Sequence, residues 1–368
     1  MTLSAAILMA GCEAPAKELR IAPTRAYVDA RWVLLQAAED PDPQVRTHAL
    51  EALAVTEGKA VGAVFVQSLK DDRVPVVAAA AMAIGECRYA PALPELVKLA
   101  RNPKTPPKLM CALIYALHRL GNDEFTNTLG ALLHHRDKFV RAEAARIMGK
   151  MGVPSAVGPL KSLQRDDFEV VVRLNVAEAL AMLGDKRSLG LLEAFTKSQF
   201  LEDRLIAVAA LGKLRHARSV YVLQRLVREA DQDPIVRVAA AGSLAELGRS
   251  EGKEYLLKAL RDPEGVLRKA RGKGAEIRKT EVVTLQTLAI LGLEKLGDVL
   301  AVDLVHPLLS SKQGAVRVAA ARAILRLLAR YRPRGEVPAP AESGAPAAVG
   351  PASRPARRPT LHISGAKD

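Results

Sequence analysis

The chain of 368 residues is poor in aromatic side chains, which make up 4% of it as one Trp, six Tyr and six Phe. Its hydrophobic residues, 49% of the total, are mostly Ala, Leu and Val. Sheet sandwiches draw heavily on aromatic and β-branched residues, whereas small aliphatic side chains let helices approach one another closely. The composition therefore favours helix-on-helix packing over a sheet sandwich.

Cysteine is also scarce. Cys12, Cys87 and Cys111 are the three present, and no two have the spacing of a zinc or redox motif. The sequence has no Gly-rich phosphate loop and no nucleophile elbow. Beyond the first dozen residues, no apolar run approaches the roughly 18 residues that a membrane span needs. We therefore expect neither a disulfide framework nor a metal, cofactor or catalytic site.

The charge is strongly one-sided. Lys and Arg number 54 against 40 Asp and Glu, which gives a formal net charge of +14. Such a balance is compatible with an anionic partner, whether nucleic acid, lipid headgroups or an acidic protein, and does not choose among them.

What the chain does have is a repeat. A Val-Arg pair followed by small apolar residues at helical spacing recurs along it, as at Arg46, Arg141 and Arg237. The equivalent positions are 46, 77, 108, 141, 173, 204 and 237, followed by weaker or later copies at 283 and 317. The first six gaps are 31, 31, 33, 32, 31 and 33 residues. A second amphipathic segment follows each copy, so the sequence predicts about nine units of two helices.

A single helical hairpin cannot bury its apolar stripe, whereas stacked neighbours can. The predicted fold class is therefore all-α, a right-handed α-solenoid of about nine hairpins over residues 24–331. With neighbouring helices about 8–10 Å apart, nine units would form a curved rod on the order of 90 Å long. Five aspartates in the turns before the first helices are expected at helix N-termini: Asp40, Asp72, Asp137, Asp167 and Asp233.

The pattern Asp-x-x-Val-Arg-x-x-Ala-x-x-Ala-Leu-Gly resembles the short bacterial HEAT-like repeats called phycobilisome-lyase HEAT-like repeats, over residues 40–331. The resemblance implies an armadillo-like solenoid in which the repeated Arg and Asp side chains pair along the stack as a ladder. The implied ladder members are Arg46, Arg141, Arg173, Arg237 and Arg317; the alternative interpretation is a phosphate-binding stripe. Iron-binding HEAT-like hydroxylases repeat His-Glu pairs, and this sequence has no such dipeptide. We expect neither a metal nor a bilin site.

The period breaks once. Positions 237 and 317 are 80 residues apart where two periods would take about 64, and the extra residues lie near 261–279. This stretch holds seven basic residues, three acidic ones and three glycines. We predict a basic loop that contacts an anionic surface, or else a solvated loop without a partner. The candidate partner-binding residues are Arg268, Lys269, Arg271, Lys273, Arg278 and Lys279, with Lys161, Arg225, Arg228 and Lys258 on the second helices.

The two ends of the chain differ from the repeats. The string LMAGC resembles a bacterial lipobox, although Met9 replaces the usual Leu and no basic segment precedes the apolar run. Residues 1–12 are thus predicted to be a lipoprotein signal peptide ending at Cys12, the lipidated residue, and 13–23 a tether. Residues 332–368, rich in Pro and Ala, are predicted to be a disordered tail. The predicted location is the bacterial cell envelope, membrane-anchored and facing the periplasm or exterior.

The predicted function is a non-enzymatic, monomeric scaffold that binds a protein partner on its concave face. The alternative is a cytoplasmic nucleic-acid-binding or DNA-repair solenoid. Sites for unpaired bases rely on aromatic stacking, and the aromatic residues here mostly occupy positions expected in the core. The basic residues of the second helices are also interspersed with glutamates, which disfavours nucleic acid.

Overall fold

The computed structural model describes residues 19–229, 232–272 and 274–333. The predicted signal peptide with Cys12, most of the tether and residues 334–368 of the tail lie outside this range. The described residues form 19 α-helices and no strand, so the predicted all-α solenoid is confirmed. Among them no helix is both long and apolar enough to cross a lipid bilayer.

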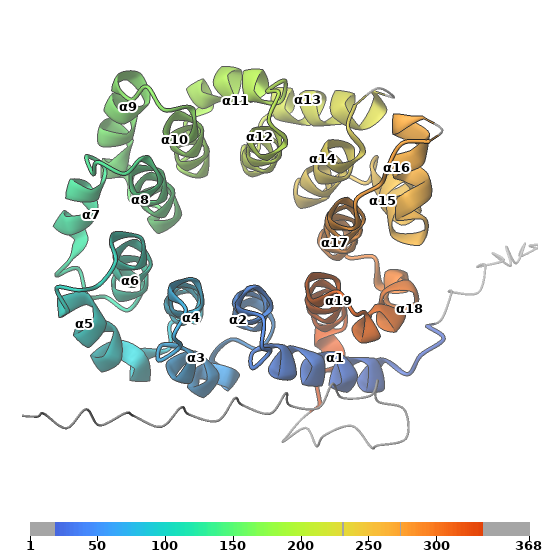
Figure 1. Cartoon of the computed structure of the whole chain (residues 1–368), viewed down its shortest axis with the longest axis horizontal. Coiled ribbons are helices and arrows are strands. Elements are labelled where there is room, and N and C mark those ends of the chain that lie inside the picture. Colours follow the sequence, from blue (N-terminus) through green and yellow to red (C-terminus); the bar gives the residue numbers. More distant parts are fainter. Residues whose placement is uncertain (1–18, 230–231, 273, 334–368) are drawn as a thin grey trace, which may run out of the picture.

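The helices form two concentric layers of a ring (Figure 1). The inner layer contains the helices that begin with the repeated motif: α2 (Pro43–Thr56), α4 (Val74–Cys87), α6 (Pro107–Arg119), α8 (Lys138–Met151), α10 (Val170–Met182), α12 (Leu201–Lys213), α14 (Pro234–Glu246), α17 (Lys279–Leu296) and α19 (Gly314–Leu327). The outer layer contains α1 (Pro23–Ala37), α3 (Gly62–Ser68), α5 (Leu93–Arg101), α7 (Thr126–Leu132), α9 (Val157–Asp166), α11 (Leu189–Phe195), α13 (Ala217–Arg228), α15 (Lys253–Arg261), α16 (Pro263–Arg271) and α18 (Val302–Val305).

Polar turns start the inner helices and glycines end several of them. Asp137 accepts a hydrogen bond from the backbone N–H of Phe139 at the start of α8, and Asp233 does the same for Ile235 at the start of α14. These side chains satisfy backbone donors that a helix end leaves free. At the other end of α8, Gly152 has φ 73°, a left-handed conformation that glycine adopts readily. The helix therefore stops where the chain turns toward the outer layer.

Small residues let neighbouring inner helices touch. A Cβ atom on Gly149 of α8 would lie 2.5 Å from Cα of Ala179 on α10, and one on Gly85 of α4 would lie 2.9 Å from Cα of Ala116 on α6. Gly149 and Ala179 follow their motif positions by eight and six residues. The same offsets for Gly85 and Ala116 place the third motif at Met110, so its predicted position at residue 108 was two residues too early.

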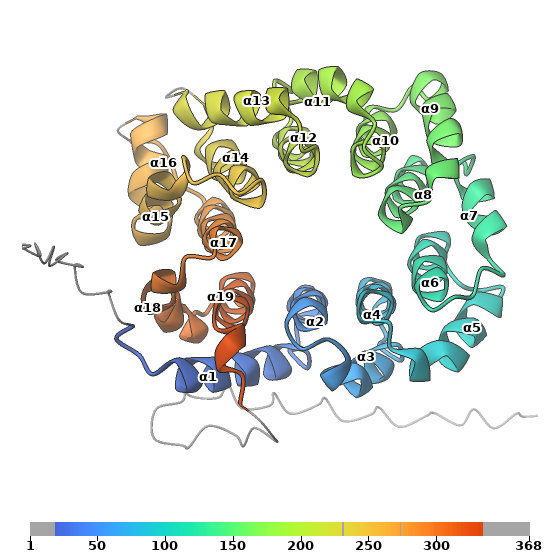
Figure 2. The same ribbon diagram turned by 180° about the vertical axis from the view of Figure 1, so that it is seen from behind.

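The ring is closed, and the expected curved rod was wrong. Helix α1 packs against both α19 and α2, in the outer layer beside α18 (Figures 1 and 2). It thus takes the place of the outer helix that the ninth unit would otherwise lack. No unit presents an open end, because the first helix of the chain completes the last repeat.

The insertion is also different from the prediction. Within residues 261–279, Pro263–Arg271 form a short helix, α16, rather than a projecting loop. It packs against α15, α17 and α14, and its two large apolar residues, Val266 and Leu267, are buried. The extra residues therefore add a helix to the outer layer.

Candidate interaction surfaces

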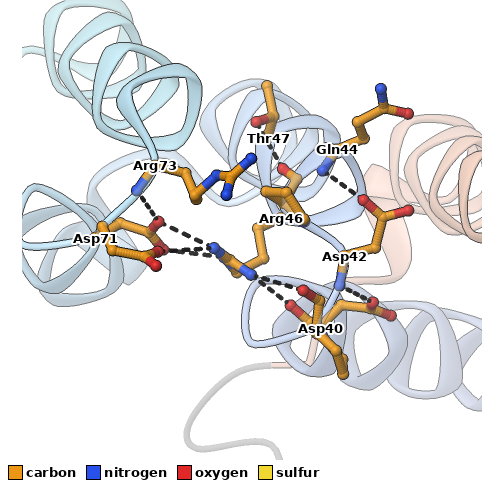
Figure 3. Close-up of polar contacts among 10 residues, drawn as sticks. Asp40, Asp42, Gln44, Arg46, Thr47, Asp71 and Arg73 are labelled. Atoms are coloured by element: carbon orange, nitrogen blue, oxygen red, sulfur yellow. Dashed lines mark hydrogen bonds and ion pairs between the residues drawn. The ribbon is translucent and has the colours of Figure 1, made fainter.

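Arg46 shows how the repeated arginine links one unit to the next (Figure 3). Its Nε and Nη2 each lie 2.9 Å from an oxygen of Asp71, in the turn that precedes the next inner helix. Its Nη1 donates to the backbone carbonyls of Asp40 and Pro41, at 2.9 and 3.2 Å. The guanidinium therefore ties together two successive turns with a two-pronged ion pair.

Arg141 repeats this geometry three units later. It donates to the two carboxylate oxygens of Asp167 at 2.7 and 3.2 Å, and to the carbonyls of His135 and Arg136. Although burial alone would raise the pKa of Asp71 and Asp167, the hydrogen bonds from the arginines and from the backbone hold both below the usual range. These contacts are structural, which leaves no free phosphate stripe at these two positions.

The same step joins the last unit to the first. Arg317 Nη2 lies 2.9 Å from Asp40 Oδ2, while Nη1 donates to the carbonyl of Ser311. Asp40 stands six residues before Arg46, as Asp71 and Asp167 stand six before the next motif positions, 77 and 173. The ladder therefore runs across the seam, which is the contact between α1, α2 and the α18–α19 segment.

A buried carboxylate holds both ends of the chain at this seam. Glu57, just after α2, accepts from Tyr27 and Arg31 of α1 at 2.8 and 3.1 Å. It also accepts from Arg332, beyond α19, at 3.0 Å. The Glu57 side chain is fully buried, so its charge depends on these donors.

Further contacts fix the residues that precede α1. The backbone N–H of Arg20 lies 3.1 Å from Asp303 of α18, and His306 lies 3.1 Å from Asp29 of α1. Leu19 and Ile21 pack on the core. Residues 19–22 were expected in the tether, but they are bound to the ring.

The remaining two implied ladder arginines have other surroundings. Arg237 donates to the carbonyl of Val227 and lies over the ring of Tyr255, 4.2 Å from its centroid. Arg173 differs from all the others, because its Nε is buried and has no hydrogen-bond partner among the described residues.

The Arg–Asp pairs place the turns before the inner helices on one face of the ring. We call this the ladder face; it comprises the turns that begin at residues 40, 71, 135, 167, 198 and 311 and the first residues of the helices that follow. Several exposed apolar side chains lie on it: Val74, Phe139, Phe168, Val170 and Phe200. Phe168 is 97% exposed, Phe200 59% and Phe139 51%, so three of the six phenylalanines face solvent. The expectation that the aromatic residues mostly lie in the core was therefore wrong for these three.

The basic residues of the insertion are partly neutralised. Arg271 and Arg278 both pair with the buried carboxylate of Glu281, and Arg268 pairs with Glu264. The hydrogen bonds from Arg271 and then Arg278 lower the pKa of Glu281 to about 2. Lys269 and Lys279 are exposed and form no ion pair among the described residues, while Lys273 lies outside them.

The four candidates on the second helices do not lie on the concave face. They belong to α9, α13 and α15 in the outer layer (Figure 1). Lys161 pairs with Asp185 at 2.6 Å and Arg225 with Glu229 at 3.3 Å. Arg228 and Lys258 are exposed.

Several cations of the inner layer pair with carboxylates of other inner helices. Lys213 of α12 lies 2.7 Å from Glu178 of α10, and Lys295 of α17 lies 2.7 Å from Glu246 of α14. Arg322 of α19 donates to Glu294 of α17 at 2.9 Å. These pairs fasten successive units to one another, and they leave fewer free charges on the concave side for a partner.

The described part of the chain offers no obvious reaction chemistry. It contains no group of three His, Cys, Asp or Glu side chains arranged to bind a metal. Burial raises the pKa of the Cys111 thiol to about 12 and that of Cys87 above its ordinary value. Both thiols are therefore poor nucleophiles at neutral pH.

A family model described as HEAT repeats matches residues 16–85, 31–112, 93–181, 126–199 and 188–273, which together span 16–273. No curated protein sequence matches the chain. Among solved structures, human deoxyhypusine hydroxylase in complex with glycerol is 21% identical, with 68% of this chain and 96% of that chain covered and a TM-score of 0.33. The complex of CpcE and CpcF of phycocyanin lyase from Nostoc sp. PCC7120 is 18% identical, with 84% and 97% covered and a TM-score of 0.31.

Proposed function

This chain belongs to the HEAT-repeat family, and we propose that it is a non-enzymatic scaffold that binds a protein partner on the ladder face of its ring. The observation that carries the proposal is the exposure of Phe139, Phe168 and Phe200 in three consecutive units. Exposed aromatic side chains grouped on one face are typical of protein interfaces. The concave side was the expected site, but several of its cations, such as Lys213 and Lys295, are engaged in pairs between helices.

The test compares partner recovery by matched variants. Crosslinked pull-downs from membranes are made with the wild type and with a variant that carries Phe139→Ala, Phe168→Ala and Phe200→Ala. Tyr221→Ala is the control, because Tyr221 is 64% exposed but lies on α13 in the outer layer. Proteins recovered by the wild type and the control but lost from the triple variant support the proposal. Equal recovery by all three would contradict it.

The second part of the proposal is a lipid anchor at Cys12, which would hold the ring at a membrane of the bacterial envelope. It is supported by the sequence LMAGC at residues 8–12. Several acyl chains, each contributing about 0.8 kcal/mol per buried CH₂, would give stable attachment. Labelling with palmitate should disappear in Cys12→Ser, and label that persists in this variant would rule the anchor out.

Binding of single-stranded nucleic acid is the second candidate, because Lys108 lies 4.8 Å from the centroid of the exposed Phe139 ring. Aromatic rings next to basic side chains are typical of such sites. Against it, the residues that flank Phe168 in the sequence are acidic. Asp166, Asp167 and Glu169 each pair with a cation, so these cations are not free to bind phosphates. Anisotropy with a thymidine oligonucleotide at two salt concentrations decides: salt-sensitive binding that the triple variant loses would favour nucleic acid.

A further inference from the structure

The ladder follows a rule that the geometry makes plain. Where a unit carries the repeated arginine, the next turn provides an aspartate six residues before its own motif position, as in Arg46–Asp71, Arg141–Asp167 and Arg317–Asp40. The units of Met110 and Val283 lack the arginine. In the turns that follow them, the position of the aspartate is occupied by His135 and Ser311.

Two steps depart from this rule. After the unit of Arg237, the position six residues before Val283 is Ile277. Arg237 instead donates to the carbonyl of Val227 and lies over the ring of Tyr255.

The other departure follows Arg173. Counting back six residues from Arg204 gives Ser198, although the preceding unit carries Arg173. Ser198 occupies the same local position as the aspartates, since its hydroxyl accepts from the backbone N–H of Phe200 at 3.2 Å, and it also donates to Asp203 at 2.8 Å. Asp167 accepts from the N–H of Glu169 in the same manner.

The guanidinium at this step lacks what its counterparts have. The Nε atoms of Arg46 and Arg141 each donate to an aspartate, whereas Nε of Arg173 is buried without a hydrogen-bond partner among the described residues. Nε of Arg204 is also unpartnered there, but its Nη1 lies 3.4 Å from the side-chain oxygen of Gln232. A buried charged donor without a hydrogen-bond acceptor is costly. At this step Arg173 thus faces a turn with Ser198 at the position where Arg46 and Arg141 meet a carboxylate.

The two turns at this step also carry the most exposed phenylalanines. Phe168 precedes Arg173 by five residues and Phe200 follows Ser198 by two, with exposed fractions of 97% and 59%. Val170, 48% exposed, begins α10 beside them. Apolar side chains thus flank the missing carboxylate from both neighbouring turns.

We propose that a partner protein supplies this carboxylate: an Asp or Glu side chain, flanked by apolar residues, pairs with Arg173 while its neighbours cover Phe168 and Phe200. This inference rests on the proposed function and adds the chemistry of the partner. The net charge of +14 favours an acidic partner over a basic one. A single carboxylate matches the group that Asp71 and Asp167 provide at the equivalent steps.

The test uses one substitution that fills the position and one that does not. Random peptides of about 12 residues are selected against the full chain, and the enriched sequence is synthesised with a fluorescent label. We expect an acidic residue flanked by apolar ones. Ser198→Asp, which completes the ladder from within, should weaken binding at least about tenfold, the scale of a lost charge-assisted pair. Ser198→Asn, of similar size but uncharged, should leave the affinity within about twofold.

The outcomes separate the two levels of the proposal. If Phe168→Ala and Phe200→Ala abolish binding while Ser198→Asp does not, the ladder face binds but the role of Arg173 is wrong. If no substitution on this face changes binding, the proposed function fails as well. Self-association of the chain that Ser198→Asp abolishes would make the occupant a second copy, and tighter peptide binding after deletion of residues 334–368 would make it the chain's own tail. Either result would overturn the partner assignment.

Discussion

Arg317 and Asp40 are separated by 277 residues in sequence, yet their side chains meet at 2.9 Å and form the same ladder step that joins neighbours elsewhere in the ring. Their partly buried positions, 26% and 19% exposed, make this contact more than a surface pair. The ring is thus closed by the same Arg–Asp interaction that joins successive units.

The first prediction concerns this seam. Asp40→Asn should lower the free energy of unfolding by about 1 kcal/mol, because Arg317 loses a charged acceptor. Hydrogen exchange should quicken in α1 and α19 and stay unchanged in α8 and α10. Asp167→Asn is the matched control within the ring, with the reverse pattern of exchange. Equal acceleration in all four helices for both variants would show that the seam is not a local unit.

The second prediction concerns the contact between α8 and α10. Gly149→Ala should destabilise the protein by about 1–3 kcal/mol, because the added Cβ would lie 2.5 Å from Cα and 2.7 Å from Cβ of Ala179. Gly130→Ala in α7 adds a Cβ with nothing within 4 Å, and should be neutral or stabilising by up to about 1 kcal/mol. Urea unfolding of both variants measures the difference, and a similar effect at the two sites would contradict the close approach.

The third prediction concerns pH. The pKa of Glu281 is lowered from 4.5 to about 2 by its bonds to Arg271 and Arg278. A carboxyl whose folded pKa is depressed stabilises the fold above its unfolded pKa and loses this effect as pH falls toward the folded value. Glu281→Gln should therefore be less stable than the wild type at pH 6, and the gap should shrink between pH 4.5 and 2. A gap that stays constant over this range would exclude the assigned cause.

The fourth prediction concerns the thiols. In a Cys12→Ser variant at pH 8, Cys87 should react slowly with a disulfide reagent and Cys111 more slowly still. Burial of Cys111, with Glu143 nearby, raises its pKa to about 12, so almost no thiolate is present. Denaturant should make both react at one rate. Fast labelling of Cys111 in the native protein would contradict its burial.

The sequence predicted the inner layer well for physical reasons that act locally. Val before Arg, small residues at helical spacing and a closing glycine can be read within one unit, as at Val140, Arg141 and Gly149. Parts of this pattern recur because each unit packs on a similar neighbour. The third motif was misplaced because Lys108 is the residue most like an arginine there, whereas the packing of Gly85 on Ala116 sets the register at Met110. Helix α16 was not predicted because Val266 and Leu267 are its only large apolar residues, and two apolar residues among charged ones give no helical periodicity.

Ring closure could not be read from the sequence, because it depends on small rotations between units that add up over the whole array. Helix α1 carries no Val-Arg motif to mark it as the missing outer helix. For the candidate site, the relevant residue is visible in the sequence, because Ser198 occupies a position where other units have an aspartate. Its significance could not be predicted without the structure, which shows that Arg46 pairs with Asp71 of the next unit.

The position of α1 has a consequence for how the chain folds. During synthesis from the N-terminus, α1 is made first and its partner α19 last. The apolar residues of α1 can therefore pack against α19 only after about 280 further residues have been made. The seam is then the last contact to form and, by the same entropy of loop closure, the first that thermal motion would undo. A force applied to the residues before Leu19 would therefore act on the seam before it acted on the rest of the ring.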